Sequence, residues 1–206
     1  MDRRPVLVVG IFLLGAYLTP SVVVAQQNLP PGSLTIKVLA EKRLATLPAG
    51  RPKLYWRLEN FPSLGQAQAA AGPTGLAVES AGKDWLFTLG NKGGASLGGT
   101  KIAEIGPLPS VTASEYLLRI NEPSGPLGST TIVHTHPGVE ALYTVAGELC
   151  LRTLDGTERI PAGRGVAGPP GGLPTQVSSC GSSDLRGFVM FVVDAKKPFS
   201  TPSVFP

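Results

Sequence analysis

The chain has 206 residues and a formal net charge of +4, a length that provides one well-buried core and is short for two full-sized domains. The positive charge is spread thinly along the sequence, which excludes the basic clusters of nucleic-acid-binding proteins, so we expect no nucleic-acid partner. The 26 Gly and 20 Pro punctuate apolar runs instead of forming one long tract, a composition that predicts short strands, tight turns and an all-β fold.

The first 25 residues have the pattern of a secretory signal peptide. Arg3 and Arg4 precede an apolar run from Val6 to Leu18, and small residues lead to Ala25. Export machinery needs this order of charge, apolar centre and small residues, and Pro20 interrupts the run before it reaches the roughly 20 residues of a spanning helix. We therefore expect cleavage after Ala25, a secreted or periplasmic protein, and no stable membrane insertion after cleavage; an uncleaved anchor is the alternative.

The next segment, 26–110, predicts a β extension that packs on a barrel. It begins with a polar, Pro-rich stretch, after which short runs with strand-like alternation are bounded by Gly, Pro or Asn. The runs are Leu34–Val38, Leu54–Glu59, Gly75–Glu79, Trp85–Leu89 and Lys101–Ile105. One Ala-rich stretch, Gln66–Ala71, predicts a short helix that Gly72 and Pro73 end.

Residues 111–195 form a denser β region, which we interpret as a jelly-roll barrel. Ser114–Asn121 alternates, with Tyr116, Leu118 and Ile120 on one face, and Asn121–Pro126 predicts a turn. The following strand-length runs are Thr130–His136, Glu140–Ala146, Glu148–Leu154, Arg164–Gly168, Pro174–Ser178 and Gly187–Val193. Residues 196–206 contain three prolines and predict a loosely held tail.

The two His of the chain lie close together in this region. Residues two apart on a strand face the same side, so His134 and His136 present both imidazoles to one surface, and Glu140 can return on the next strand after a turn at Pro137–Gly138. Two imidazoles and one carboxylate form a facial set that binds iron, manganese, zinc or nickel and leaves coordination positions open for substrate. The cofactor we expect is therefore a divalent metal ion.

The spacing G-x5-H-x-H-x3-E-x6-G is present as Gly128, His134, His136, Glu140 and Gly147, and it resembles the first motif of the cupin superfamily. The resemblance covers about residues 114–194 and implies a cupin-like jelly-roll β-barrel, preceded here by the N-terminal β extension, with a metal near its centre.

The second cupin motif, G-x5-P-x-G-x2-H-x3-N, is degenerate. Gly163, Pro169 and Gly171 match it, but Pro174 stands where the family has His and Ser178 where it has Asn. Since Pro offers no side-chain ligand, the usual four-ligand site is in doubt.

A fourth ligand would have to come from another residue. Gln176, two positions along from the missing His, has a side-chain oxygen that is a weak candidate, and water is the alternative. A further alternative is that the two His are hydrogen-bonded strand residues of a site that no longer binds metal.

Strand parity suggests which neighbours line the pocket. Leu142 and Thr144 share the parity of Glu140, and Ile132 lies beside the first His, so these three are pocket candidates, although each could equally be core. Tyr143 has the opposite parity and is expected to pack outside the barrel. Glu140 could also act as a general acid or base instead of a ligand.

Two arginines and two cysteines complete the candidates. Arg119 and Arg152 could contact an anionic substrate, although isolated Arg residues on strands are usually solvated. Cys150 and Cys180 are the only cysteines, and an oxidising compartment would allow them to form a disulfide; the alternative is two small buried side chains. No catalytic residue is assigned.

Two functions fit these observations. The first is a metal-dependent dioxygenase or isomerase acting on a small polar or phenolic molecule. The second is a non-catalytic module that binds a small molecule, or an accessory protein, with a weakened or empty metal site. Whether the chain is an enzyme is left open at this point; the partner in either case is a small-molecule ligand or substrate, and a homodimer is compatible with both.

Overall fold

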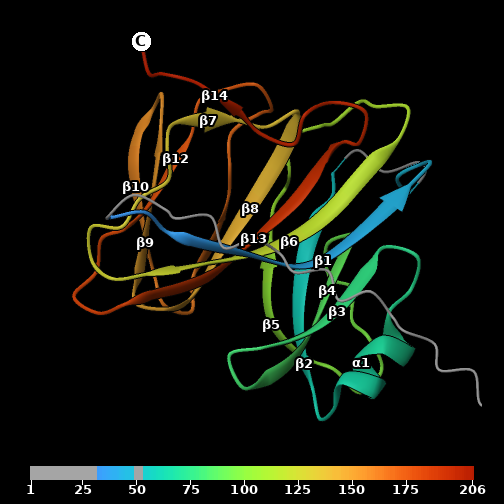
Figure 1. Ribbon diagram of the computed structural model, residues 1–206. Coiled ribbons are helices and arrows are strands. Elements are labelled where there is room, and N and C mark those ends of the chain that lie inside the picture. Colours follow the sequence, from blue (N-terminus) through green and yellow to red (C-terminus); the bar gives the residue numbers. More distant parts are fainter. Residues whose placement is uncertain (1–31, 49–52) are drawn as a thin grey trace, which may run out of the picture.

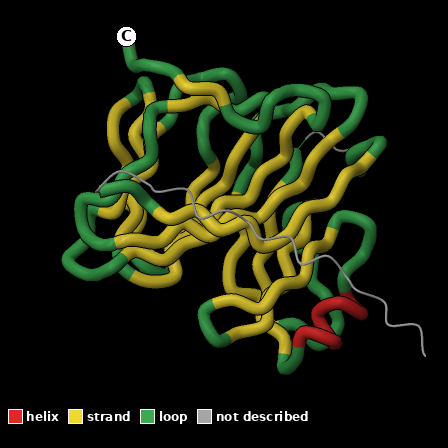
Figure 2. The backbone as a smooth tube through the Cα atoms, viewed as in Figure 1, coloured by secondary structure: helices red, strands yellow, loops and turns green. Residues whose placement is uncertain are grey.

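The structure is a computed structural model that describes residues 32–48 and 53–206; the expected signal peptide lies outside these residues. The described chain contains fourteen strands and one helix, which confirms the predicted all-β class (Figures 1 and 2). Within that part of the chain no helix is long and apolar enough to cross a membrane.

The N-terminal sheet has four antiparallel strands in the order β3-β4-β2-β5. The bounds are β2 Tyr55–Phe61, β3 Gly75–Ser80, β4 Lys83–Gly90 and β5 Thr100–Ile105. Helix α1, Leu64–Ala70, connects β2 to β3 and begins where the Ser63 hydroxyl accepts a hydrogen bond of 3.3 Å from the Gln66 backbone N–H, an N-cap that satisfies one of the free donors of the first turn.

The barrel consists of a five-stranded sheet in the order β1-β6-β13-β8-β11, a three-stranded sheet in the order β10-β9-β12, and the pair β14-β7. The first sheet contains β1 Thr35–Leu44, β6 Tyr116–Gly125, β8 Gly138–Ala146, β11 Gly165–Ala167 and β13 Leu185–Asp194. The others contain β7 His134–Thr135, β9 Glu148–Thr153, β10 Gly156–Pro161, β12 Gln176–Ser179 and β14 Thr201–Pro202. This arrangement of antiparallel sheets is the predicted jelly-roll barrel.

The central strands of the five-stranded sheet are buried on both faces. One face of β8, with Val139, Ala141 and Tyr143, packs against the N-terminal sheet, and the other, with Leu142, packs inside the barrel. Because side chains alternate along a strand, the same division applies to β6 and β13. It places Glu140 inside the barrel and Tyr143 outside, as strand parity predicted.

Strand β1 connects the two halves of the chain. It precedes the boundary expected near residue 110, yet it pairs antiparallel with β6 at the edge of the barrel's own sheet. The rest of the extension forms the separate four-stranded sheet that covers the barrel. The N-terminal half therefore supplies both a barrel strand and a covering layer.

Two predicted local structures are wrong. The turn expected at Asn121–Pro126 is strand as far as Gly125, because β1 and β13 pair with β6 from both sides. The strand expected at Thr130–His136 is reduced to β7, with Thr130 in isolated bridges only. Partners that are distant in sequence decided both cases.

The C-terminal segment is not a loosely held tail. Strand β14 pairs with β7, and the Ser203 N–H donates to the Val133 carbonyl at 2.9 Å. Phe199 packs on Phe191 of the barrel interior, with ring centroids 4.9 Å apart. These contacts bring residues 199–203 to the side of the barrel that holds the two His.

Candidate metal centre and cavity

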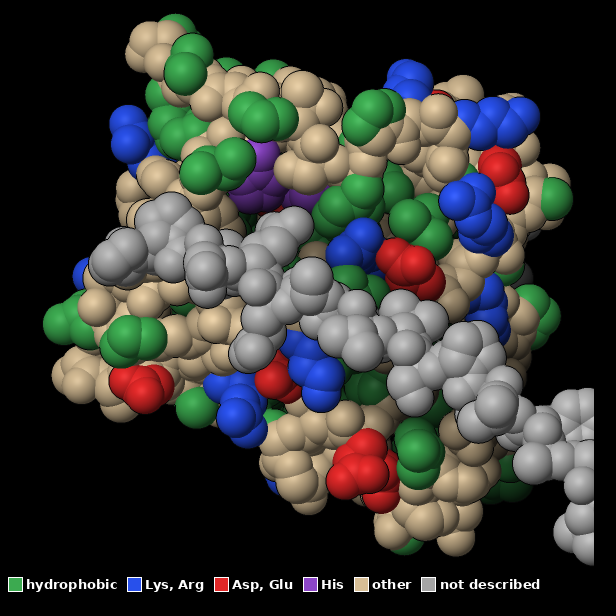
Figure 3. All heavy atoms as spheres, viewed as in Figure 1, with side chains coloured by type: hydrophobic (Ala, Val, Ile, Leu, Met, Phe, Trp, Pro, Cys, Tyr) green, Lys and Arg blue, Asp and Glu red, His purple; other side chains and the backbone are tan. Residues whose placement is uncertain are grey.

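Two strands and the link between them place the predicted ligands inside the barrel. His134 belongs to β7, His136 follows that strand directly, and Glu140 lies on β8. Their exposed fractions are 9%, 7% and 4%, and all three line one cavity of about 490 Å³. The His side chains are visible at a hollow in the surface (Figure 3).

Both imidazoles are oriented by backbone carbonyls. Nδ1 of His134 lies 2.8 Å from the carbonyl oxygen of Ile132, and Nδ1 of His136 lies 2.7 Å from that of Phe199. A carbonyl only accepts, so each Nδ1 must carry the proton and each neutral ring keeps a free lone pair on Nε2. Backbone partners of this kind fix the orientation of metal-binding His residues.

Three buried polar atoms beside these rings make no well-formed hydrogen bond within the described residues: Nε2 of His136, Oε1 of Glu140 and Oγ1 of Thr175, although the Thr175 hydroxyl is near enough to the Glu140 carboxyl to affect its pKa. The same three residues line a small void of about 10 Å³, close to the least volume that holds one water molecule. Buried polar groups are normally satisfied. A void of this size lined by unpartnered donors and acceptors is suited to one water molecule or one ion.

Burial moves the pKa values of the two closest groups in opposite directions. The pKa of His136 is lowered to about 4, mainly by desolvation and to a smaller extent by the charges of His134 and Arg119, while its hydrogen bond to Phe199 opposes the shift. Desolvation raises the pKa of Glu140 to about 7, and Thr175 opposes that rise. Both groups therefore tend to the uncharged form, which a bound cation would reverse for the carboxyl.

The donor chemistry fits a divalent metal. Nε2 of His136 and Oε2 of Glu140 are 4.0 Å apart, somewhat more than the roughly 3.0–3.6 Å that separates neighbouring ligands held about 2.0–2.2 Å from one ion. The rings of His134 and His136 are 4.8 Å apart at their centroids. Over residues 32–48 and 53–206, however, no three His, Cys, Asp or Glu side chains already converge at ligand distances. Binding by all three would require side-chain movement.

The structure corrects three of the other site predictions. Gln176 does not face the site, because its Nε2 donates to the Thr131 carbonyl at 3.0 Å and the adjacent Val177 lines the cavity instead. Leu142 and Thr144 face the barrel interior but lie in its packed core and are not among the residues that line the cavity. Ile132 does line the cavity, at its exposed edge.

Sequence reasoning missed Thr175 and Phe199. Thr175 pairs through its backbone with His134, and Phe199 comes from the segment predicted to be loose. In the sequence, Thr175 is simply the residue between Pro174 and Gln176, and Phe199 is an aromatic residue in a Pro-rich segment. Neither pattern indicates a site. Arg119 was considered, and the structure brings it into the cavity; Arg152 lies elsewhere, over the ring of Phe205.

Cys150 of β9 and Cys180, which directly follows β12, form a disulfide. Their strands are neighbours in the three-stranded sheet, where Cys150 pairs with Ser178. The bridge therefore links β9 to the residue that follows β12, and neither cysteine lines the cavity described above.

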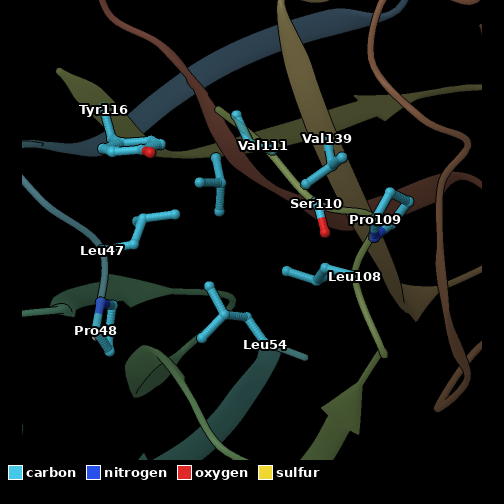
Figure 4. Close-up of a pocket in the computed structure, with 10 residues that line it drawn as sticks. Leu47, Pro48, Leu54, Leu108, Pro109, Ser110, Val111, Tyr116 and Val139 are labelled. Atoms are coloured by element: carbon cyan, nitrogen blue, oxygen red, sulfur yellow. The ribbon is translucent and has the colours of Figure 1, made fainter. Parts of the chain in front are cut away.

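A second cavity, of about 210 Å³, lies between the barrel and the N-terminal sheet. Four of its apolar side chains point into this cavity (Figure 4): Leu47, Leu54, Leu108 and Val111. Its described lining has no charged side chain. The polar side chains of this lining are those of Ser110 and Tyr116, so the described residues offer no usual metal ligand here.

No known protein family matches the chain, and no curated protein is similar to it in sequence. Solved structures that are similar include a cupin-like protein from Thermotoga maritima, with 15% identity, 42% of this chain and 64% of that chain covered, and a TM-score of 0.38. A DMSP lyase from Ruegeria pomeroyi has 20% identity, covers 42% and 43%, and has a TM-score of 0.36. An oxalate oxidase in complex with the substrate analogue glycolate has 22% identity, covers 41% and 45%, and has a TM-score of 0.35.

Proposed function

We propose that His134, His136 and Glu140 bind one divalent metal ion, of iron, manganese, zinc or nickel, and that the protein acts on a small molecule in the adjoining cavity. The observation that carries the proposal is the arrangement of the two imidazoles. Both rings use Nδ1 on a backbone carbonyl and keep Nε2 free, beside an unpartnered oxygen of a buried carboxyl. Metal-binding His residues are oriented in this way, with one ring nitrogen hydrogen-bonded and the other free to bind the ion.

The reaction class that fits best is a metal-dependent dioxygenase or isomerase reaction on a small polar or phenolic molecule. When bound, the metal would supply Lewis-acid activation. The chain's own residues orient the ligands through backbone carbonyls and surround the cavity with apolar side chains that exclude water. In the metal-free protein the pKa of Glu140 is raised to about 7, so this carboxyl can hold or release a proton at neutral pH, whereas as a metal ligand it would be ionised.

A second candidate is a module that binds a small molecule without converting it. The observation that favours it is the absence, within the described residues, of three ligand side chains that already converge. The cavity of about 490 Å³ is within the usual range for small-molecule sites. In this case the metal, if bound, would be weakly held.

We also propose that the protein is exported, to the periplasm or outside the cell. The basic, apolar and small-residue order of residues 1–25 supports export. The disulfide between Cys150 and Cys180 supports it independently, since disulfides persist in oxidising compartments. The test is the N-terminus of the exported protein by mass spectrometry, which should begin at Gln26 or Gln27; an intact Met1 would refute the proposal.

Metal binding is tested by the element content of exported protein purified without a His tag. The wild type should contain close to one equivalent of a single element, and the double variant His134→Ala, His136→Ala should lose it. Gln176→Ala is the matched control, because this side chain lies beside the site without facing it, and it should keep the metal. If the wild type stays empty after incubation with each of the four metals in turn, the metal proposal is wrong.

A further inference from the structure

Arg119 points into the same cavity as the metal ligands. It lies on β6, where Leu118 and Ile120 pack against the N-terminal sheet and the alternate residues Arg119 and Asn121 line the cavity. An isolated Arg on a strand is usually solvated because one face of the sheet is open. Here one face packs against the N-terminal sheet, and the other, which carries Arg119, faces the inside of the barrel. Its side chain is 19% exposed, and it is near enough to His136 to lower the pKa of that ring.

The guanidinium group is held in place before any ligand binds. Nε donates to Oδ1 of Asn121 at 2.9 Å, Nη1 lies 3.2 Å from Oε1 of Glu41, and the group lies 4.0 Å from the ring centre of Phe199. These contacts use two of the five N–H donors of the fork. Because the Glu41 side chain is 46% exposed, solvent screens its charge, and the pair neutralises Arg119 only weakly.

The rest of the lining is mainly apolar. Arg119 and Glu140 are the only Arg, Lys, Asp or Glu residues among those that line the cavity in the described chain. Apolar residues of the same lining include Leu34, Val177, Val189, Phe191 and Phe199. The cavity thus combines one fixed cation, an apolar wall and the residues proposed as metal ligands.

We propose that Arg119 is the anchor for the carboxylate of an amphipathic monocarboxylate, whose apolar body lies along the barrel interior and whose other end reaches the metal ligands. The last part rests on the metal-dependent function proposed above. The planar fork pairs with two oxygens of a carboxylate or of a phosphate; a carboxylate is favoured because phosphate sites usually combine several donors and Arg119 is the single Arg or Lys of the described lining. Arg119 therefore determines specificity and takes no part in bond breaking.

Arg152 offers a matched control. It also stacks on an aromatic ring of the C-terminal segment, with its guanidinium 4.2 Å from the ring centre of Phe205, but it does not line the cavity. The variants Arg119→Gln and Arg152→Gln thus remove the same charge and the same kind of stacking, one inside the cavity and one outside.

The experiment measures binding of benzoate and of its neutral analogue benzamide by calorimetry, with the full exported chain in its oxidised form. Each protein is tested with and without Zn²⁺, and Zn²⁺ affinity is measured separately. Benzoate should bind the wild type about 10- to 100-fold more tightly than benzamide, the range expected for a charged hydrogen bond. Arg119→Gln should lose that difference, Arg152→Gln should keep it, and Zn²⁺ affinity should change little in either variant.

Equal affinity for benzoate and benzamide, no benzoate binding at millimolar concentration, or full benzoate affinity in Arg119→Gln would each overturn the proposal. If Arg119→Gln does not fold, Arg119→Lys replaces it: the charge and stem remain but the fork is lost, so benzoate should bind more weakly, and unchanged affinity would refute the anchor. If the wild type fails to bind Zn²⁺ but Arg119 still controls benzoate binding, the metal function fails while the anchor stands.

Discussion

Replacing Glu140 by Gln should stabilise the metal-free protein at alkaline pH. Burial raises the pKa of this carboxyl from 4.5 to about 7, so the folded state holds the proton more tightly than the unfolded state. Ionised Glu140 therefore destabilises the folded state. This loss of stability is absent below about pH 4.5, the pKa in the unfolded state, grows between pH 4.5 and 7, and is complete above pH 7. At about 1.36 kcal/mol for each pKa unit, it amounts to about 3 kcal/mol.

The assay is urea unfolding of wild type and Glu140→Gln, both stripped of metal and with the disulfide intact, at pH 5 and pH 8. The amide has nearly the shape of the protonated acid, so the two proteins should differ little at pH 5, whereas the variant should be more stable at pH 8 by about 3 kcal/mol. Addition of divalent metal should then stabilise the wild type and not the variant. A variant that is equally stable or less stable at pH 8 would refute the argument from desolvation.

Glu59 is the matched control, because it is a buried carboxyl with the opposite shift. Burial alone would raise its pKa, but the hydroxyl and N–H of Ser96, together with Arg57 at 2.9 Å, outweigh burial and hold the pKa below its ordinary value. Its contribution to stability is present above the unfolded pKa and is lost as the pH falls through the lower folded pKa. Glu59→Gln should therefore destabilise the protein at pH 8, the reverse of Glu140→Gln.

Three further changes test other parts of the structure. A chain that ends at Pro198 loses the carbonyl that orients His136. Its metal affinity, measured by competition with a chelating dye, should fall about 10- to 100-fold. Unchanged affinity would show that the C-terminal segment has no part in the site. Replacing Cys150 and Cys180 by Ser removes a cross-link between residues 30 positions apart. Denaturant unfolding should show that the free energy of unfolding falls by about 3–4 kcal/mol; no loss would contradict the bridge. Gly138→Ala should lower stability by about 1–3 kcal/mol, because an added Cβ would overlap the backbone of β13; an unchanged melting temperature would mean that the strands can separate at this point.

The alternation of side chains was sufficient to predict the parity of the barrel strands. It placed Glu140 inward and Tyr143 outward, and it brought both His to one surface, because the period of a strand is set by the backbone alone. Bounding turn residues located most of the strands, although the edge strand β10, Gly156–Pro161, was missed, since its polar run Thr157–Arg159 lacks alternating apolar residues.

Local patterns failed where distant partners competed with them. The Pro and Gly residues at the end of β6 predicted a turn, but pairing with β1 and β13 kept them in strand. The same parity argument that was correct for Glu140 misplaced Gln176, because β12 begins only at that residue and the numbering from the degenerate motif did not fix its face.

The sequence by itself determined the all-β class, the barrel and the two imidazoles with their carboxylate, because these depend on residue spacing along single strands. Only the tertiary structure decided two other features. The segment after residue 195 supplies the carbonyl that orients His136, and the side chain of Arg119 lies in the cavity of the barrel instead of on an open sheet face. These features depend on which strands, far apart in the chain, come to lie side by side. That choice is made by the burial of whole faces and not by any local run of residues.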